Sequence, residues 1–196
     1  MGELEPETKI MEMECDSTVG LRYLMNSCRK GVVVGVQGNP ETLRLTDTAS
    51  GLIQPTNYEL EGEPMGYDCI LLFSFKTKGT TDKRADLLKM LSYARYHISE
   101  EGSLIIGDIF EKGETDTFTS LFRGFGFKVV DHEDISKNMA YASKLNQKKV
   151  AVEEGKLVHC LMENAKGYVE GVSRWLFQKK KSGGSGNFQV FILGKG

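Results

Sequence analysis

The amino-acid sequence predicts an α/β fold, a three-layer sandwich around a seven-stranded and mostly parallel sheet. Short apolar runs alternate with amphipathic stretches from Lys9 onward, which is the pattern of strand–helix–strand units. The runs GVVVGV at 31–36 and YDCILLFSF at 67–75 are almost continuously apolar, as strands buried on both faces should be. With 196 residues, 40% of them hydrophobic, we expect one domain over residues 1–196.

The first part of the chain is expected to alternate three strands with two helices. After an apolar first strand, Ser17 or Thr18 can begin a helix because its hydroxyl accepts a hydrogen bond from a free backbone N–H. Asn39-Pro40 suits the start of the second helix, and Gly51 suits its end. In chain order we expect a strand at 9–13, a helix with Val19, Tyr23, Leu24 and Cys28 facing inward, a strand at 31–36, a helix at 41–49 and a weak strand at 52–60.

The second part continues the same alternation. Thr81-Asp82 can cap a helix whose apolar residues recur at helical spacing, and Glu101-Gly102 can form the turn before the next strand. The run NFQVFIL near the end predicts a last strand. In chain order we expect a strand at 67–75, a helix from 81 to 98, a strand at 103–110, a short helix at 118–125, a sixth strand that starts at 127–130 and a strand at 187–193.

Composition excludes several classes of function. The net charge is -2, with a pI near 6.0, and the sequence has no clustered basic region of the kind that binds nucleic acid. The amino-terminal residues are acidic, and no run approaches the roughly 18 apolar residues of a membrane span, so we expect no membrane partner and a cytoplasmic location. The cysteines lack the spacing of a metal site or a disulfide framework: Cys15, Cys28, Cys69 and Cys160.

The segment KIMEMECDSTVGLRYL at 9–24 has the layout of a nucleotide-binding strand, loop and helix. The free N–H groups at the helix start and its partial positive charge lie at a strand end, where a phosphate or carboxylate can bind. Functional loops of this kind use glycine, because bare backbone can turn tightly and approach the ligand closely. Here the loop contains Glu14, Cys15, Asp16, Ser17 and Thr18, and no glycine.

Five segments together resemble the class I S-adenosylmethionine-dependent methyltransferases. They are the first motif at 10–24, VVGVQGNPETL at 33–43, the Tyr-Asp strand at 67–74, the turn and strand at 99–110, and GFKVVDHEDIS at 126–136 with the last strand. The resemblance implies a Rossmann-like sheet with an antiparallel last strand. The closing part of the chain is similar to a small-molecule branch of the family. In that branch a helical lid lies between the sixth and seventh strands, which here corresponds to about 135–178.

The resemblance also suggests which residues would contact S-adenosylmethionine. Glu12 matches an acidic residue often found in the family's first strand, and Gln37 stands where an acidic residue accepts both ribose hydroxyls. The residues assigned to cofactor binding in this way are Glu12, Asp16, Thr18, Gln37 and Phe73. No catalytic residue is recognised.

Several departures from the family predict a degraded first motif. Its glycines would fall at Glu14, Asp16 and Thr18, so side chains should fill space that the cofactor's methionine part needs. The carboxylates of Glu14 and Asp16 would also face the carboxylate of the cofactor. Like charges close together in a partly desolvated site cost a few kcal/mol unless a cation or a proton compensates them. Gln37 replaces a charged acceptor with a neutral one, which binds a hydroxyl about half as strongly. The family also places helices before the first strand, where this sequence has eight residues. Either a protein partner covers the open cofactor face, or no small molecule is enclosed there.

Two side-chain groups have alternative interpretations. Glu14 and Asp16 could bind a cation or an amine, or they could be loop carboxylates favoured by the helix dipole. His132, between two acidic neighbours, could act as a general base or could belong to a polar strand end.

For the whole chain we expect a methyltransferase-like protein that is non-catalytic or weakly active and serves as a binding or scaffolding partner. The alternative is an active methyltransferase for a small molecule, because such enzymes work largely by positioning their substrates.

Overall fold

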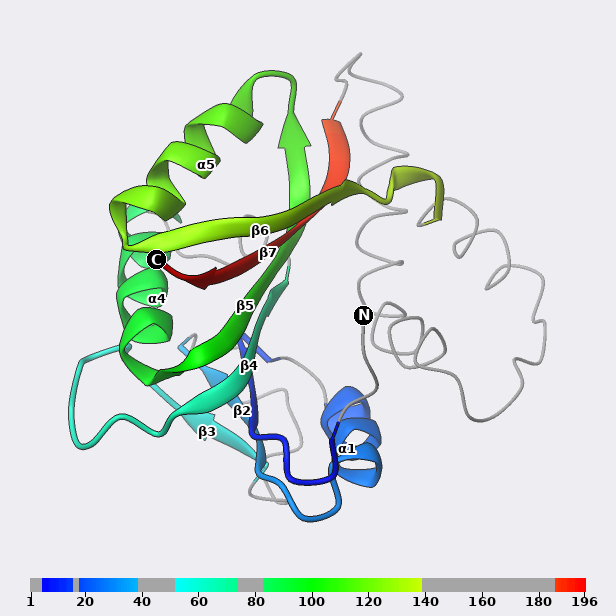
Figure 1. Cartoon of the computed structure of the whole chain (residues 1–196), viewed down its shortest axis with the longest axis vertical. Coiled ribbons are helices and arrows are strands. Elements are labelled where there is room, and N and C mark those ends of the chain that lie inside the picture. The colour runs from blue at the N-terminus through cyan, green and yellow to red at the C-terminus, as the bar shows by residue number, and fades with distance from the viewer. Residues whose placement is uncertain (1–4, 16–17, 39–51, 74–82, 139–185) are drawn as a thin grey trace.

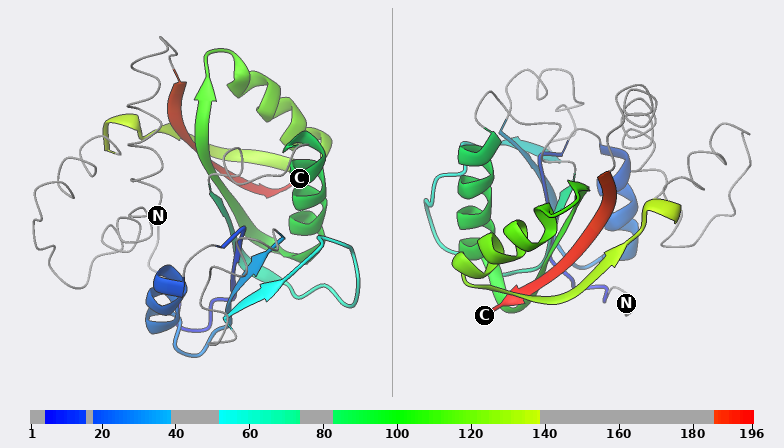
Figure 2. Two further views of the ribbon diagram at one scale, coloured as in Figure 1. Left: turned by 180° about the vertical axis from the view of Figure 1, so that it is seen from behind. Right: turned by 90° about the horizontal axis from the view of Figure 1, so that it is seen from above.

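The computed structural model describes residues 5–15, 18–38, 52–73, 83–138 and 186–196. Within these ranges the chain forms three layers, with a twisted sheet between helices (Figure 1). Helices α4 and α5 lie on one face of the sheet and α1 on the other, as the view from above shows (Figure 2). The predicted three-layer α/β architecture is therefore confirmed.

The described residues form seven strands and three helices. The strands are β1 (Ile10–Met13), β2 (Val33–Gln37), β3 (Ile53–Pro55), β4 (Tyr67–Phe73), β5 (Ile98–Glu111), β6 (Phe127–Asp134) and β7 (Gly186–Lys195). The helices are α1 (Thr18–Ser27), α4 (Lys83–His97) and α5 (Glu114–Gly124). None of these helices combines the length and the apolar character that crossing a bilayer requires.

The seven strands form one sheet in the order β3-β2-β1-β4-β5-β7-β6. Strands β1 to β5 pair in parallel, and β7 pairs antiparallel with both β5 and β6. The predicted mostly parallel sheet with an antiparallel last strand is confirmed. The chain extends from β1 toward β2 and β3 on one side and toward β4 and β5 on the other, so the strand order reverses at β1.

The larger core lies between the sheet and helices α4 and α5. It contains Met11 and Met13 of β1, together with Leu91 and Ala94 of α4 and Phe122 of α5. On the opposite face, Leu24 of α1 and Cys28, just after the helix, pack against Ile10, and Leu21 of α1 packs against Cys15 and Ile53. Alternate residues of β1 thus point to different cores, which is why this short strand is apolar at most positions.

The inward face of α1 differs in part from the prediction. Leu24 and Cys28 are buried as expected, whereas Tyr23 is half-buried and Leu21 is fully buried instead. The side chain of Val19 lies outside the described residues.

Several predicted element boundaries were wrong. The strand expected at 52–60 ends at Pro55, because Pro lacks a backbone donor and Tyr58 adopts a left-handed backbone with φ of 58°. Strand β5 begins five residues early, at Ile98, where it pairs with Tyr67. Strand β6 does start at Phe127, as expected, and it runs to Asp134 because its polar end still pairs with β7. Helix α5 begins at Glu114 rather than 118, directly after a left-handed glycine.

The helix expected at 41–49, the cap at Thr81-Asp82 and residues 139–178 of the expected lid lie outside the described residues. The single domain over 1–196 stays a prediction.

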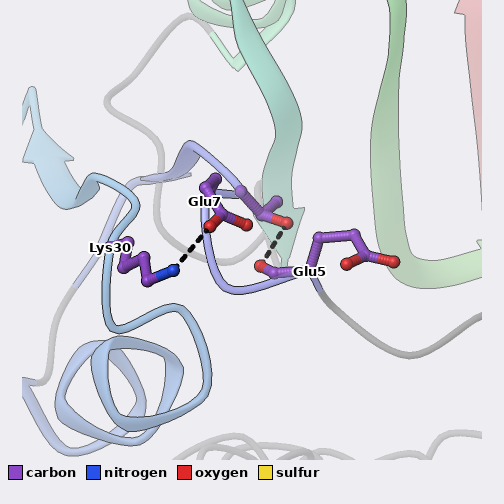
Figure 3. A network of polar contacts seen from close by, with 4 residues as sticks. Glu5, Glu7 and Lys30 are labelled. Carbon is purple, nitrogen blue, oxygen red and sulfur yellow. Dashed lines mark hydrogen bonds and ion pairs between the residues drawn. The ribbon is translucent and has the colours of Figure 1, made fainter.

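Residues 5–9 lie against the turn that precedes β2. The backbone N–H of Lys30 donates to the Pro6 carbonyl at 2.9 Å, and the Lys30 ammonium pairs with Glu7 at 3.2 Å. The Thr8 hydroxyl donates to the Glu5 carbonyl at 2.7 Å (Figure 3). This network holds the chain that enters β1. Both charged groups of the Lys30–Glu7 ion pair are well exposed, so the pair itself contributes little. The hydrogen bonds to backbone carbonyls therefore account for most of the order of residues 5–9.

Candidate functional site

The candidate site lies where the carboxyl ends of β1, β2 and β4 meet. Met13 pairs with Val36 on one side and with Leu72 on the other, so the three strands end almost level. Ligands of open α/β sheets bind at this edge, where the strand order reverses. The residues that follow these strands therefore determine what can bind.

Glu14 follows β1 directly and turns its side chain toward the end of β2. Its carboxylate Oε1 accepts hydrogen bonds from the Gly38 backbone N–H at 3.2 Å and from the Tyr58 hydroxyl at 2.5 Å. The residue is 5% exposed and has a left-handed backbone with φ of 53°. This conformation costs a residue with a Cβ roughly 1–2 kcal/mol and costs glycine little. The backbone at Glu14 thus suits glycine, the residue that the family resemblance places there.

Tyr58 comes from the loop between β3 and β4. Its backbone N–H donates to the Thr56 hydroxyl oxygen at 3.0 Å, and its ring meets that of Tyr93 edge-on, with centroids 5.4 Å apart. Burial, reinforced by the nearby Glu14 charge, raises the pKa of the Tyr58 phenol well above its ordinary value. The phenol therefore stays protonated and donates to Glu14. Within the described ranges, Glu14 and Tyr58 are the non-glycine residues with positive φ.

Gly38 completes this contact. A Cβ at this position would lie 2.7 Å from Cε2 of Tyr58 and 3.0 Å from Oε1 of Glu14. A side chain would push the phenol and the carboxylate apart, so the contact requires glycine here.

Gln37, the last residue of β2, is buried and directed back toward β1. Its side-chain Nε2 donates to the Cys15 carbonyl at 3.1 Å, and the Cys15 N–H donates to the Val36 carbonyl at 3.0 Å. The Gln37 amide therefore holds the loop after β1 against β2.

Of the remaining predicted site residues, Glu12 and Phe73 lie at the same edge or beside it. Glu12 is buried in β1, level with Gly35 and Leu71, and strand alternation places it on the α1 face. Phe73 ends β4, and its ring lies over Gly107, where a Cβ would be 2.5 Å from its Cδ1. Thr18 is the first residue of α1, but its side chain lies outside the described residues, as does Asp16.

The structure thus brings Glu12, Gln37 and Phe73 to the ends of three adjacent strands. Sequence analysis missed Tyr58 and Gly38, which complete the contact with Glu14. Tyr58 is 44 residues from Glu14, and no local pattern in the sequence indicates that they meet.

A second polar group lies at the ends of β5, β6 and β7. Nε2 of His132 lies 2.7 Å from Oε1 of Gln189, and its ring stacks on Phe191 with centroids 4.3 Å apart. Asp108 is buried, and its Oδ1 accepts the Ile109 N–H at 2.6 Å. These contacts favour the interpretation of His132 as part of a polar strand end. Among the described residues, no group of three or more His, Cys, Asp or Glu side chains could hold a metal ion.

Comparison by sequence finds no match, because neither a protein-family model nor a curated protein matches this chain. Comparison by structure does find similar folds, and the three named below are 11% to 12% identical to this chain. The [4+2]-cyclase SpnF is 12% identical, with a TM-score of 0.58, over 98% of this chain and 76% of its own. Phosphoethanolamine N-methyltransferase 2 of Haemonchus contortus, solved in complex with S-adenosyl-L-methionine, is 12% identical, with a TM-score of 0.57, over 99% of this chain and 50% of its own.

A third similar structure is a Haloferax volcanii methyltransferase in complex with the activator Trm112. It is 11% identical, with a TM-score of 0.53, over 98% of this chain and 85% of its own. At such low identity these likenesses establish the fold and leave the chemistry open. Together with the strand order, they show that the chain has the fold of the class I S-adenosylmethionine-dependent methyltransferases.

Proposed function

We propose that this chain is a methyltransferase-like protein whose S-adenosylmethionine site is degraded, and that it acts as a non-catalytic or weakly active binding partner. The observation behind this proposal is the position of Glu14. Its buried carboxylate extends from β1 to the end of β2 and accepts hydrogen bonds from Gly38 and Tyr58. In the family-like arrangement this edge is bare backbone, so a side chain here competes with the cofactor for space.

The other groups at this edge fit the cofactor poorly. A ribose diol needs a hydrogen-bond acceptor, and at the end of β2 the N–H of Gly38 and the hydroxyl of Tyr58 already donate to one oxygen of the Glu14 carboxylate. The Gln37 amide N–H₂ is engaged by the Cys15 carbonyl. Glu12, Asp16, Thr18 and Phe73 stay the predicted contacts for any cofactor that does bind. We derive no methyl-transfer step from these residues.

The alternative is an active S-adenosylmethionine-dependent methyltransferase for a small molecule, and one observation favours it. The Glu14 carboxylate lies beside Gly38, directly after the position where the family has its acidic residue. Glu14 could thus supply from β1 the charged acceptor that Gln37 lacks. In this case the carboxylate would assist cofactor binding instead of obstructing it.

The structural neighbours allow both proposals. One is a cyclase and another was solved with S-adenosyl-L-methionine, so proteins of this fold include different activities. The complex of a similar methyltransferase with Trm112 supports a protein partner for this chain, which we propose covers the open cofactor face. A cytoplasmic location stays a prediction from composition.

Calorimetric titration with S-adenosylmethionine and S-adenosylhomocysteine tests the proposal. We expect no heat of binding at millimolar ligand for the wild-type protein. Micromolar binding would overturn the proposal and favour the alternative.

Two variants then separate the roles of Glu14. If Glu14 obstructs the cofactor, Glu14→Gly should gain affinity relative to the wild type, whereas Glu14→Gln, which keeps the bulk, should not. If Glu14 is a ribose acceptor, Glu14→Gln should weaken binding about 10-fold or more, since a charged acceptor is lost. Glu59→Gln, in the exposed loop next to Tyr58, is the matched control and should behave like the wild type.

A further inference from the structure

We propose that Gly38 and Tyr58 form a carboxylate-binding site at the end of β2, and that Glu14 is its built-in occupant. Two donors from separate parts of the chain, the backbone N–H of Gly38 and the hydroxyl of Tyr58, converge on a single oxygen of Glu14. The ligand class of this site is a small aliphatic carboxylate. The inference rests on the same strand-end edge as the proposed function, and it names the class of ligand that this edge can bind.

The backbone and the neighbouring side chains hold the two donors in place. Tyr58 and Glu14, the two partners of the contact, both adopt a left-handed backbone. Strained backbone of this kind persists only where the surrounding contacts stabilise it. Two further contacts position the Tyr58 side chain. The Tyr58 backbone N–H donates to the Thr56 hydroxyl, and the Tyr58 ring packs against the ring of Tyr93.

The donors also select charge. Hydrogen bonds from an N–H and an O–H to an ionised carboxylate are shorter and about twice as strong as those to a neutral acceptor. Burial keeps the Tyr58 phenol protonated, so it remains a donor up to high pH. A carboxylate should therefore bind here in preference to an amide of the same shape.

Removal of the Glu14 side chain should leave a vacancy of known shape. The side chain beyond Cα is CH₂–CH₂–COO⁻, and propionate has the same three carbons and the same charged end. Glycine suits the φ of 53° at position 14, so Glu14→Gly should keep the backbone that brings the two donors together. Propionate should then occupy the place that Glu14 vacates.

The experiment measures the thermal unfolding midpoint of Glu14→Gly in sodium propionate. Propionamide serves as the neutral isostere, and sodium chloride matches the ionic strength. We expect propionate to raise the midpoint by about 3 to 6 °C at ten times its dissociation constant. The wild-type protein, whose site Glu14 already fills, should show no difference between propionate and chloride.

A double variant identifies the donor. In Glu14→Gly/Tyr58→Phe the hydroxyl is absent, and propionate should bind at least about 10-fold more weakly than to Glu14→Gly. Tyr96→Phe, which removes a hydroxyl bound to the Gly62 carbonyl, is the matched control and should leave propionate binding unchanged. Equal stabilisation by propionamide, or equal propionate binding without the Tyr58 hydroxyl, would overturn the inference.

A measurement in the wild-type background tests the inference even if Glu14→Gly does not fold. Glu14→Gln keeps the shape and removes the charge, so the Gly38 amide proton should move upfield in the NMR spectrum as its hydrogen bond weakens. An unchanged Gly38 resonance would contradict the inference. The cofactor titration above is a separate readout, since propionate can bind whether or not S-adenosylmethionine does.

Discussion

The two halves of the sheet, one around β5, β6 and β7 and the other around β1, β2 and β3, differ in the interactions that stabilise them. Around β5, β6 and β7 the strands are long, and Phe122 of α5 packs edge to face on Phe191, which packs in the same way on Phe110. Around β1, β2 and β3 the strands have three to five residues, and the space at their ends is occupied by a buried carboxylate, a buried amide and a phenol. The half around β5, β6 and β7 is ordered by apolar packing, while the strand ends of the other half add a few directed hydrogen bonds and two left-handed residues to their apolar packing.

This contrast indicates where function can change at low cost. Apolar packing is distributed over many contacts, so single changes in it mainly alter stability. The strand-end contact of Glu14, Gly38 and Tyr58 is local, so changes there should alter what the edge binds and leave the fold intact.

The largest expected effect is in the packed half. Phe122→Ala removes a fully buried ring that contacts Phe191, and should lower the free energy of unfolding by about 3–5 kcal/mol. Urea denaturation followed by circular dichroism measures it. Val130→Ala, at a side chain 58% exposed in β6, is the control and should stay within about 0.5 kcal/mol of the wild type. Similar values for both variants would contradict the proposed contrast.

A smaller effect is expected at the strand ends. Gly38→Ala places a Cβ 2.7 Å from the Tyr58 ring, so it should separate the phenol from Glu14 and cost about 1–3 kcal/mol in the same assay. Gly124→Ala, in α5, has no atom within 4 Å of its new Cβ and should be neutral or slightly stabilising. A harmless Gly38→Ala would show that the strand-end contact is looser than the distances indicate.

The smallest expected effect depends on pH, at His97. Burial lowers the pKa of this imidazole from 6.5, and its Nδ1 accepts the Met65 N–H at 3.4 Å. Between the lowered pKa and 6.5 the unfolded chain binds more protons, so the free energy of unfolding should fall as the pH drops from 7 through this window. Asp134, whose pKa is lowered by its hydrogen bonds with Ser136, should act only at more acidic pH.

Denaturation at pH 7 and pH 5.5 measures this difference for the wild type and for His97→Gln. The glutamine oxygen can still accept from Met65 but does not titrate in this range. The variant should therefore lose part of the pH dependence. An identical dependence in both proteins would exclude His97 as its source.

The fold could be predicted from the sequence because strand and helix periodicity is local information. Continuous apolar runs such as 31–36 and 67–75 correctly indicated central strands, and the Tyr-Asp strand aligned the chain with its fold family. The boundaries were less accurate where a polar run belongs to a strand, as after Ile98 at the start of β5, or where β3 ends early, at Pro55.

The site could be predicted only in part. Its location followed from the strand–loop–helix layout, and Glu12, Gln37 and Phe73 do lie at adjacent strand ends. The contact between Glu14 and Tyr58 depends on a loop conformation with positive φ, for which the sequence gives no signal, since glycine and asparagine are its usual indicators.

The left-handed backbone at Glu14 also has an evolutionary consequence. Both glutamate codons become glycine codons by a single base substitution, and the main chain here already has a shape that glycine adopts without strain. A single base substitution therefore separates the present sequence from one with glycine, and no side chain, at position 14. Natural variation at this codon could switch the protein between a self-filled edge and an open one without any need to redesign the fold.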